Sequence, residues 1–164
     1  MKWRAITMAG IALLASHLLA GCARNVPHAT REGPLVAFGD SLVYGTGSSG
    51  GGFVSLLEQS LGRPIENLGV PGDTTFANLS AIIERLQADG ATVLLVGVRG
   101  GLIRDNFAAR FEELADRYGT GYVHDVLDDT LGVKGYMADQ VHPNDAGYRV
   151  IADRVHPFLA AMLE

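Results

Sequence analysis

The feature that most constrains the fold is a regular alternation between short apolar runs and segments whose apolar residues recur at helical spacing. The strand-type runs, several of them rich in β-branched residues, cover residues 35–38, 64–70, 91–98 and 121–127. The helical segments cover residues 53–61, 76–86 and 107–115, and a last one, for which Asn144 is a good N-cap, runs to about residue 163. Strands that alternate with helices predict βαβ units, and therefore an α/β fold with a parallel sheet covered by helices on both faces.

The first residues are typical of an export signal. Lys2 and Arg4 form a positive flank, an apolar run follows over residues 6–20, and small residues precede the single cysteine, Cys22. Residues 19–22, Leu-Ala-Gly-Cys, resemble the lipobox of bacterial lipoproteins, in which the cysteine receives a diacylglyceryl group. We therefore predict a lipoprotein signal peptide over residues 1–21, a tether over 22–33 and one domain over 34–164. The alternative is an ordinary secretory signal that contains one thiol.

The lipoprotein resemblance also implies a location. A lipid at Cys22 would anchor the protein in the bacterial cell envelope, and Ala23 after the cysteine favours the outer membrane, facing the periplasm. Loss of Lys2 and Arg4 with the signal would change the net charge from −5 to −7, because two positive charges are removed. An acidic chain without a basic run is a poor match for nucleic acid.

Three side chains with the chemistry of a serine hydrolase lie where loops follow strands. Ser41 comes directly after the first strand-type run, in a turn that Gly39 permits. Asp139 and His142 lie three residues apart just before the last helix, where Pro143 restricts the backbone. In parallel sheets, functional groups gather in loops beyond the carboxyl ends of the strands. Because a serine nucleophile needs a base and a group that orients the base, these residues are candidates for a catalytic triad.

Three sequence blocks resemble those of the GDSL/SGNH hydrolases. Residues 36–42, Val-Ala-Phe-Gly-Asp-Ser-Leu, resemble the first block, and residues 139–143, Asp-Gln-Val-His-Pro, resemble the last. Residues 67–74 are similar to the block that supplies an oxyanion-hole glycine, which maps to Gly72. The similarity runs from about Leu35 to the C-terminus and is greatest to the small bacterial arylesterase, thioesterase I and lysophospholipase group. It implies a three-layer α/β/α, flavodoxin-like fold.

The resemblance implies a serine esterase without a cofactor or a metal. Ser41 would attack an acyl carbonyl, His142 would accept its proton and Asp139 would orient His142. The backbone N–H groups of Ser41 and Gly72 would stabilise the oxyanion, and Asp40 would shape the nucleophile turn. The expected substrates are small acyl esters, thioesters or lysophospholipids.

One family block is missing. The third block, Gly-x-Asn-Asp after a central strand, supplies an asparagine amide to the oxyanion hole, but only residues 73–75 separate Gly72 from the next helical segment. The sheet is therefore predicted to be one central strand shorter than in the family. Loss of one oxyanion donor costs about 2.7–4 kcal/mol of transition-state stabilisation. Loss of a buried strand costs on the order of 10 kcal/mol of folding free energy, which makes folding the larger question.

The remaining chain suggests how the sheet could close. We expect the run over residues 91–98 to lie beside the first strand, because the helix over 76–86 is long enough for a parallel crossover. This placement would bring the residues that follow the run near Ser41, with a leucine where the asparagine is wanted and one amide nearby: Gly100, Gly101, Leu102 and Asn106.

Other patterns have simpler interpretations. Residues 45–50 match G-x-G-x-x-G, but a dinucleotide site needs the first glycine directly after a strand, so we expect a flexible loop that lines an acyl-binding cleft. Residues 47–51 match the nucleophile elbow G-x-S-x-G around Ser49, yet no strand leads into that serine. His124 and His156 are predicted to be structural. The alternative functions are a non-catalytic envelope lipoprotein that binds acyl chains or a partner, favoured by the missing block, and a nucleotide-binding module on residues 45–50.

Overall fold

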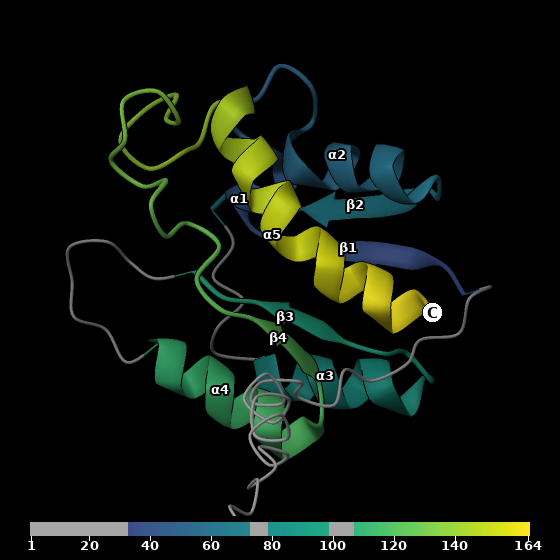
Figure 1. Ribbon diagram of the computed structural model, residues 1–164. Helices are drawn as coiled ribbons and strands as arrows, with labels where there is room; N and C mark the ends of the chain where they lie inside the picture. Colours follow the sequence, from purple (N-terminus) through teal and green to yellow (C-terminus); the bar gives the residue numbers. More distant parts are fainter. Residues whose placement is uncertain (1–32, 73–78, 99–106) are drawn as a thin grey trace, which may run out of the picture.

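The computed structural model describes residues 33–72, 79–98 and 107–164. It confirms the alternation of strands and helices, and the second, third and fourth strands are shorter than the apolar runs that predicted them (Figure 1). The elements in chain order are β1 (Leu35–Gly39), α1 (Ser41–Tyr44), α2 (Gly52–Leu61), β2 (Ile65–Gly69), α3 (Leu79–Ala88), β3 (Leu94–Val96), α4 (Phe107–Tyr118), β4 (Gly121–Val123) and α5 (Asp145–Leu163). The predicted signal peptide, the tether up to residue 32, Cys22 and Ala23 lie outside the described residues.

The described strands form two parallel pairs in place of one continuous sheet. β1 pairs with β2 in a register that sets Leu35 opposite Ile65 and Gly39 opposite Gly69. β3 pairs with β4, with Leu94 opposite Gly121. The expected pairing of the run 91–98 with the first strand is not found among the described strands, because no hydrogen-bonded ladder joins β3 to β1. The residue that would decide how near this run comes to Ser41, Gly100, lies outside the described residues.

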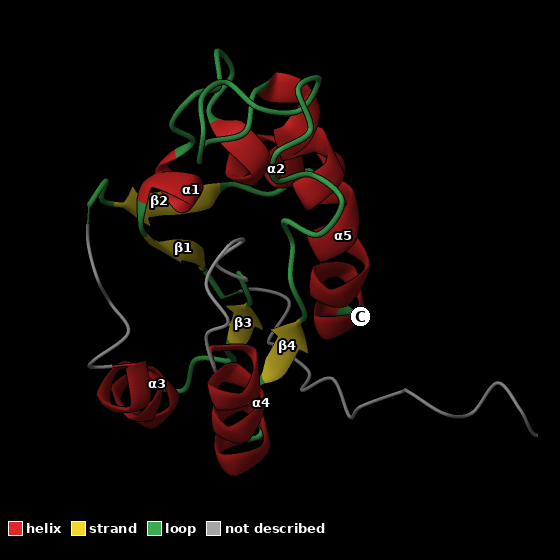
Figure 2. Cartoon of the chain, turned by 90° about the vertical axis from the view of Figure 1, so that its left-hand side faces the viewer, coloured by secondary structure: helices red, strands yellow, loops and turns green. Residues whose placement is uncertain are grey.

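The side chains of β3 are packed on both faces of the strand. Leu95 is buried on one side of β3 with Ile83 of α3 and Ala115 of α4, while Leu94 and Val96 pack into the core on the opposite side. Alternate residues of a strand point to opposite faces, so both faces of this short strand are already committed. Figure 2 shows the result, with α3 and α4 on one side of the β3–β4 pair and α5 on the other. Around the β3–β4 pair, the predicted layers of helix, sheet and helix are therefore present.

The main core lies between the β1–β2 pair, α2 and α5. Buried residues of α5 recur at helical spacing and face α2, β1 and β2: Tyr148, Ile151, Ala152 and Val155. Tyr148 and Ile151 are fully buried, and Phe53 of α2 stacks on Tyr148 with ring centroids 6.5 Å apart. This packing fixes the start of α5, and with it the loop that precedes α5, over the carboxyl end of β1.

The opposite face of the β1–β2 pair carries exposed apolar side chains. Val36 and Phe38 of β1 are 49 % and 48 % exposed, and Leu68, opposite Phe38, is 44 % exposed. Leu35 and Ala37 point the other way, into the core with α2 and α5. Within the described residues, the β1–β2 pair is thus well covered on one face only.

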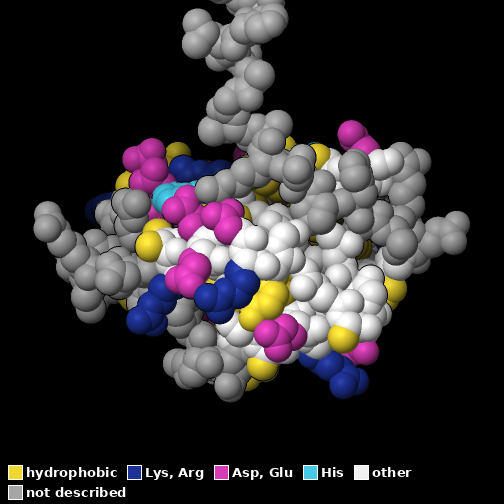
Figure 3. Space-filling model, turned by 90° about the horizontal axis from the view of Figure 1, so that it is seen from below, with side chains coloured by type: hydrophobic (Ala, Val, Ile, Leu, Met, Phe, Trp, Pro, Cys, Tyr) yellow, Lys and Arg dark blue, Asp and Glu magenta, His cyan; other side chains and the backbone are white. Residues whose placement is uncertain are grey.

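The outer helices carry short-range ion pairs. The face seen in Figure 3 has basic side chains beside acidic ones. On α3, Arg85 Nε lies 3.0 Å from Asp89 Oδ2, and on α4, Arg117 Nη2 lies 2.8 Å from Glu113 Oε1. All four side chains are more than half exposed, and such pairs contribute little to stability. No helix within the described ranges is both long and apolar enough to cross a membrane.

Candidate active site

Ser41 is the first residue of α1, at the point where β1 turns into this short helix. Asp40 caps the helix, because its Oδ1 accepts from the Leu42 N–H at 2.9 Å. Gly45 ends it in a left-handed conformation, with its N–H 3.1 Å from the Ser41 carbonyl oxygen. The Thr46 N–H donates to the same carbonyl at 3.0 Å. The backbone of Ser41 is therefore fixed from both ends of α1, and Asp40 has the turn-shaping contact expected of it.

The β1–β2 pair fixes α1 from the side. The Asn67 side-chain amide of β2 donates to the Val43 carbonyl at 2.8 Å. Gly69 approaches the α1 backbone so closely that a Cβ there would lie 2.3 Å from the Tyr44 nitrogen. Contacts this short exclude every side chain at position 69, so the sequence block around Asn67 and Gly69 serves to seat the nucleophile turn.

His142 lies in a tightly bonded loop, residues 135–144, which we call the His142 loop. Asp139 Oδ1 accepts from the backbone N–H groups of Val141 and His142, both at 2.8 Å. The His142 carbonyl accepts from the Ala138 N–H at 2.8 Å. Asn144 then caps α5, because its Oδ1 accepts from the backbone N–H groups of the second and third residues of the helix at 3.0 Å and 3.1 Å. The position and direction of the imidazole are thus set by backbone hydrogen bonds on both sides.

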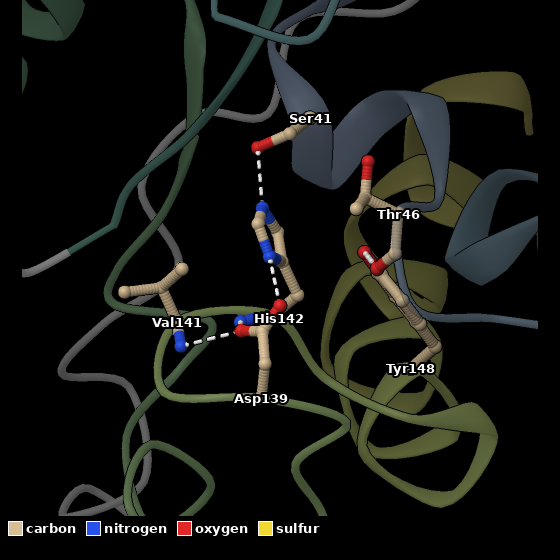
Figure 4. Close-up of polar contacts among 6 residues, drawn as sticks. All are labelled: Ser41, Thr46, Asp139, Val141, His142 and Tyr148. Atoms are coloured by element: carbon tan, nitrogen blue, oxygen red, sulfur yellow. Dashed lines mark hydrogen bonds and ion pairs between the residues drawn. The ribbon is translucent and has the colours of Figure 1, made fainter.

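The structure brings Ser41, His142 and Asp139 into one line (Figure 4). His142 Nδ1 lies 2.8 Å from Asp139 Oδ2, and His142 Nε2 lies 3.2 Å from Ser41 Oγ. Ser41 and His142 are 101 residues apart in the sequence. With the proton on Nδ1 donated to the carboxylate, Nε2 is an acceptor for the serine hydroxyl. The arrangement can therefore remove a proton from Ser41 Oγ.

The electrostatics favour an ionised Asp139. Its hydrogen bond with the His142 side chain and those from the Val141 and His142 N–H groups lower the pKa of Asp139 to about 2. The carboxylate is therefore negative throughout the neutral range, as an orienting group beside an imidazole must be. Burial and the charges of Asp40 and Asp139 raise the pKa of nearby Tyr148 to about 12, so its hydroxyl keeps its proton in the neutral range.

Gly72 follows β2 in a turn and has a left-handed backbone, with φ of +82°. The Val70 N–H donates to the Gly39 carbonyl at 2.8 Å, which continues the β1–β2 register beyond the last pair. Ser41 follows β1 and Gly72 follows β2, so both residues lie beyond the carboxyl ends of two adjacent parallel strands. Gly100, Gly101, Leu102 and Asn106 lie outside the described residues.

The glycine-rich loop between α1 and α2, residues 45–51, is bonded to α5. Ser49 Oγ donates to Asp145 Oδ2 at 2.6 Å, so this hydroxyl is not near His142 in the way Ser41 is. The segment also begins after α1 and not directly after β1, which separates it from the strand–turn–helix geometry of a dinucleotide site. No pattern in the sequence indicates these bonds, because serines and aspartates are common in any surface loop.

Cavities and metal ligands do not add to this site in the described part of the chain. A hollow of about 310 Å³ is lined by His124 and Arg154, among others, and one of about 490 Å³ lies between α2 and α5. Neither is lined by Ser41, Asp139 or His142. Among residues 33–72, 79–98 and 107–164, no group of three His, Cys, Asp or Glu side chains could hold a metal ion. His124 instead meets the Tyr122 ring edge-on, with centroids 5.9 Å apart.

Comparison with known proteins identifies the fold. No protein-family model and no curated protein sequence matches the chain. Among solved structures, TesA superposes with a TM-score of 0.73 at 23 % identity, over 80 % of this chain and 100 % of TesA. AlinE4, an SGNH-hydrolase family esterase, gives 0.57 at 24 % identity over 84 % and 97 % of the two chains. The esterase EstA from Pseudoalteromonas sp., in a structure inhibited by monoethylphosphonate, gives 0.65 at 17 % identity over 82 % and 98 %. These likenesses confirm the predicted α/β fold.

Proposed function

Starting from its GDSL/SGNH hydrolase fold, we propose that this chain is a serine esterase that hydrolyses carboxylic esters or thioesters through an acyl-enzyme. The observation that carries the proposal is the position of His142, with one ring nitrogen 2.8 Å from Asp139 Oδ2 and the other 3.2 Å from Ser41 Oγ. A carboxylate, an imidazole and a serine hydroxyl in that order are the parts that acyl transfer by serine requires. The esterases among its structural neighbours agree with this chemistry.

Acylation uses each part once. Ser41 Oγ attacks the acyl carbon while its proton passes to His142 Nε2, and ionised Asp139 stabilises the imidazolium through Nδ1–H. The resulting oxyanion accepts hydrogen bonds from the backbone N–H groups of Ser41 and Gly72. The tetrahedral intermediate then collapses, the bond to the leaving oxygen or sulfur breaks, and His142 returns the proton to that atom. The products are an alcohol or thiol and an acyl ester on Ser41.

Deacylation repeats the sequence with water. His142 Nε2 accepts a proton from the attacking water, a second tetrahedral intermediate forms, and its collapse releases the carboxylic acid and restores the Ser41 hydroxyl. The missing asparagine donor sets the expected rate. An oxyanion hole with one donor fewer stabilises the transition state by about 2.7–4 kcal/mol less, so turnover roughly a hundred- to thousandfold below that of a complete site is expected.

The sequence supports a narrower setting for this activity. The Leu-Ala-Gly-Cys run at residues 19–22 favours a lipid anchor at Cys22 and a position at the outer membrane, facing the periplasm. A lysophospholipid is an ester available at that surface, and its single acyl chain suits a small hydrolase. We therefore include lysophospholipids, with short acyl esters and thioesters, in the proposed substrate class.

The proposal is tested by ester turnover. The full chain, expressed with its leader and purified in detergent, should hydrolyse p-nitrophenyl acetate or butyrate. The Ser41→Ala and His142→Ala variants should show no turnover above background. Ser49→Ala, at the other serine in a hydrolase-like pattern, should retain turnover well above background, because it loses only a bond to Asp145. A folded wild-type protein without turnover on these esters, on acyl thioesters or on lysophospholipids would contradict the proposal.

A second candidate is a non-catalytic envelope lipoprotein that binds acyl chains. The observation that favours it is the shortened sheet, with Val36, Phe38 and Leu68 exposed where a complete sheet would be covered. Binding of a fluorescent fatty acid with no turnover of any ester would support it. Turnover that disappears in Ser41→Ala would exclude it as the main function.

A further inference from the structure

The loop between α1 and α2, residues 45–51, contacts the segment that carries His142 at three separate places. It leaves the Ser41 helix at one end and touches the His142 loop and the start of α5 along its length. The three contacts involve Gly47, Thr46 and the pair Ser48 and Ser49.

The first contact is a close approach at Gly47. Its φ of +89° lies in the left-handed region, and a Cβ there would lie 2.6 Å from the Pro143 carbonyl oxygen and 2.9 Å from the Ala138 Cβ. The His142 Cβ would be 3.3 Å away. One of these atoms is a backbone oxygen and the other two are Cβ atoms bonded directly to the backbone of the His142 loop, so they cannot move aside at little cost. The fit at Gly47 thus sets how near the His142 loop comes to the Ser41 helix.

The second contact passes through the Thr46 peptide groups (Figure 4). The Thr46 N–H donates to the Ser41 carbonyl at 3.0 Å, and the Thr46 carbonyl accepts from the Tyr148 hydroxyl at 2.8 Å. Tyr148 is fully buried in α5, six residues after His142. One residue therefore links the nucleophile's own backbone to the helix that directly follows the base.

The third contact is made by Asp145 at the start of α5. Its Oδ1 accepts from Ser48 Oγ at 2.6 Å and from the Ser49 N–H at 2.9 Å, and its Oδ2 accepts from Ser49 Oγ at 2.6 Å. Ser48 Oγ in turn accepts from the Gly52 N–H at 3.1 Å, at the first residue of α2. These bonds lower the pKa of the Asp145 carboxyl, so the bonded, ionised form is the one present at neutral pH.

We infer that this loop is a positioning clasp, in which Gly47, Tyr148 and Asp145 hold His142 Nε2 at hydrogen-bonding distance from Ser41 Oγ. The inference rests on the proposed esterase function and names positioning residues for it. The two reacting side chains come from ends of the chain 101 residues apart, and the β1–β2 and β3–β4 pairs do not form one sheet that would align them. A misplacement of about 1 Å at such a site costs on the order of a hundredfold in rate.

The sharpest test compares alanine at two glycines that both have a left-handed backbone. Gly62 has φ of +63° and no atom within 4 Å of a Cβ, so Gly62→Ala introduces left-handed strain without a clash. Gly47→Ala introduces both. We expect kcat for p-nitrophenyl acetate to fall on the order of a hundredfold in Gly47→Ala, with KM changed by less than about threefold. Gly62→Ala should keep the wild-type kcat.

A second variant covers the possibility that Gly47→Ala does not fold. Tyr148→Phe keeps the buried ring and removes only the hydroxyl that binds the Thr46 carbonyl. It should lower kcat about fivefold, the equivalent of one net hydrogen bond, without a matching rise in KM. Asp145→Asn should lower kcat in the same direction, whereas the Asp145→Glu variant should recover part of it. A wild-type kcat in Tyr148→Phe and Asp145→Asn would overturn the inference.

A readout without substrate separates this inference from the proposed function. The ring-proton resonances of His142, assigned by comparison with His142→Ala, should shift in Gly47→Ala and stay in place in Gly62→Ala. If the wild-type protein hydrolysed nothing but the resonances changed in this pattern, the clasp would stand and the esterase would not. Unchanged resonances in folded Gly47→Ala, or equal losses of kcat in Gly47→Ala and Gly62→Ala, would overturn the clasp.

Discussion

Replacement of Asp139 by asparagine isolates the orienting role of this carboxylate. Oδ1 of Asp139 accepts two backbone N–H groups at 2.8 Å each, and only Oδ2 faces His142 Nδ1. An asparagine can keep its oxygen toward the backbone, so the loop should retain its shape. Its amide nitrogen then faces Nδ1 as a donor, which favours the imidazole tautomer with the proton on Nε2. That tautomer cannot accept the Ser41 proton.

The expected magnitude follows from the loss of the correct tautomer. The corresponding change in a well-studied serine protease lowers kcat by roughly ten thousandfold, or about 5 kcal/mol of transition-state free energy. We expect a loss of that order in kcat for p-nitrophenyl acetate in Asp139→Asn. Because the Asp139 side chain is 54 % exposed, the midpoint of urea unfolding at neutral pH should fall only slightly, by the small contribution of the ionised carboxylate.

Asp153→Asn provides the control for charge. Asp153 lies on the exposed side of α5, lining the hollow between α2 and α5, away from Ser41. It changes the net charge equally and should keep the wild-type kcat. An Asp139→Asn variant that retained a tenth or more of the wild-type kcat, or an equal loss in Asp153→Asn, would refute the orienting role.

Three further predictions concern pH and stability. The pKa of Asp139 is lowered in the folded state from 3.8 to about 2, so the hydrogen bonds of the ionised carboxylate stabilise the fold fully above pH 4. This contribution should be lost as the pH falls from 4 to 2. The measurement is the difference between the urea midpoints of wild type and Asp139→Asn, which should become smaller over this pH range. Ile151→Ala removes a fully buried side chain from the main core and should lower the free energy of unfolding by about 2–5 kcal/mol, whereas Leu86→Ala, at a position 40 % exposed, should cost much less in the same urea titration. Asn144→Ala removes the cap of α5 and should cost about 0.5–2 kcal/mol of unfolding free energy by calorimetry or urea, while Asn144→Asp should cost less than Asn144→Ala.

Local pattern was enough to predict which elements form. The apolar runs and helical spacings located four strands and the main helices, since these signals depend on neighbouring residues only. The cap at Asn144 was predicted for the same reason. The four-residue helix α1 was not, because it buries no residue completely and so leaves no apolar period in the sequence.

Strand pairing could not be obtained in this way. A run such as residues 91–98 shows that a strand exists but not which strand pairs with it. The position of the strand depends on the helices and strands that pack around it, which the run itself does not reveal. In β3, Leu95 packs against α3 and α4, while Leu94 and Val96 pack against the main core. Such contacts join residues far apart in the sequence and have no local signature.

The candidate site was predictable to the extent that its side chains follow strands. Ser41, Asp139 and His142 were selected by chemistry and spacing, and the structure brings these three together. The residues that support them were missed. Gly47 lies directly against the Pro143 backbone, and the Tyr148 hydroxyl donates a hydrogen bond to the Thr46 carbonyl. Bonds to backbone atoms place no demand on the partner's side chain, so nothing in the sequence indicates them.

The most direct test of the central claim is covalent labelling of Ser41 by a fluorophosphonate, followed by intact and peptide mass spectrometry. The reaction needs a serine activated by its neighbours, and it does not depend on knowing the acyl substrate. We predict one adduct per folded chain, located on Ser41, absent in Ser41→Ala and slowed at least a hundredfold in His142→Ala. A folded wild-type protein with no adduct, or with an adduct on another residue and none on Ser41, would contradict the account.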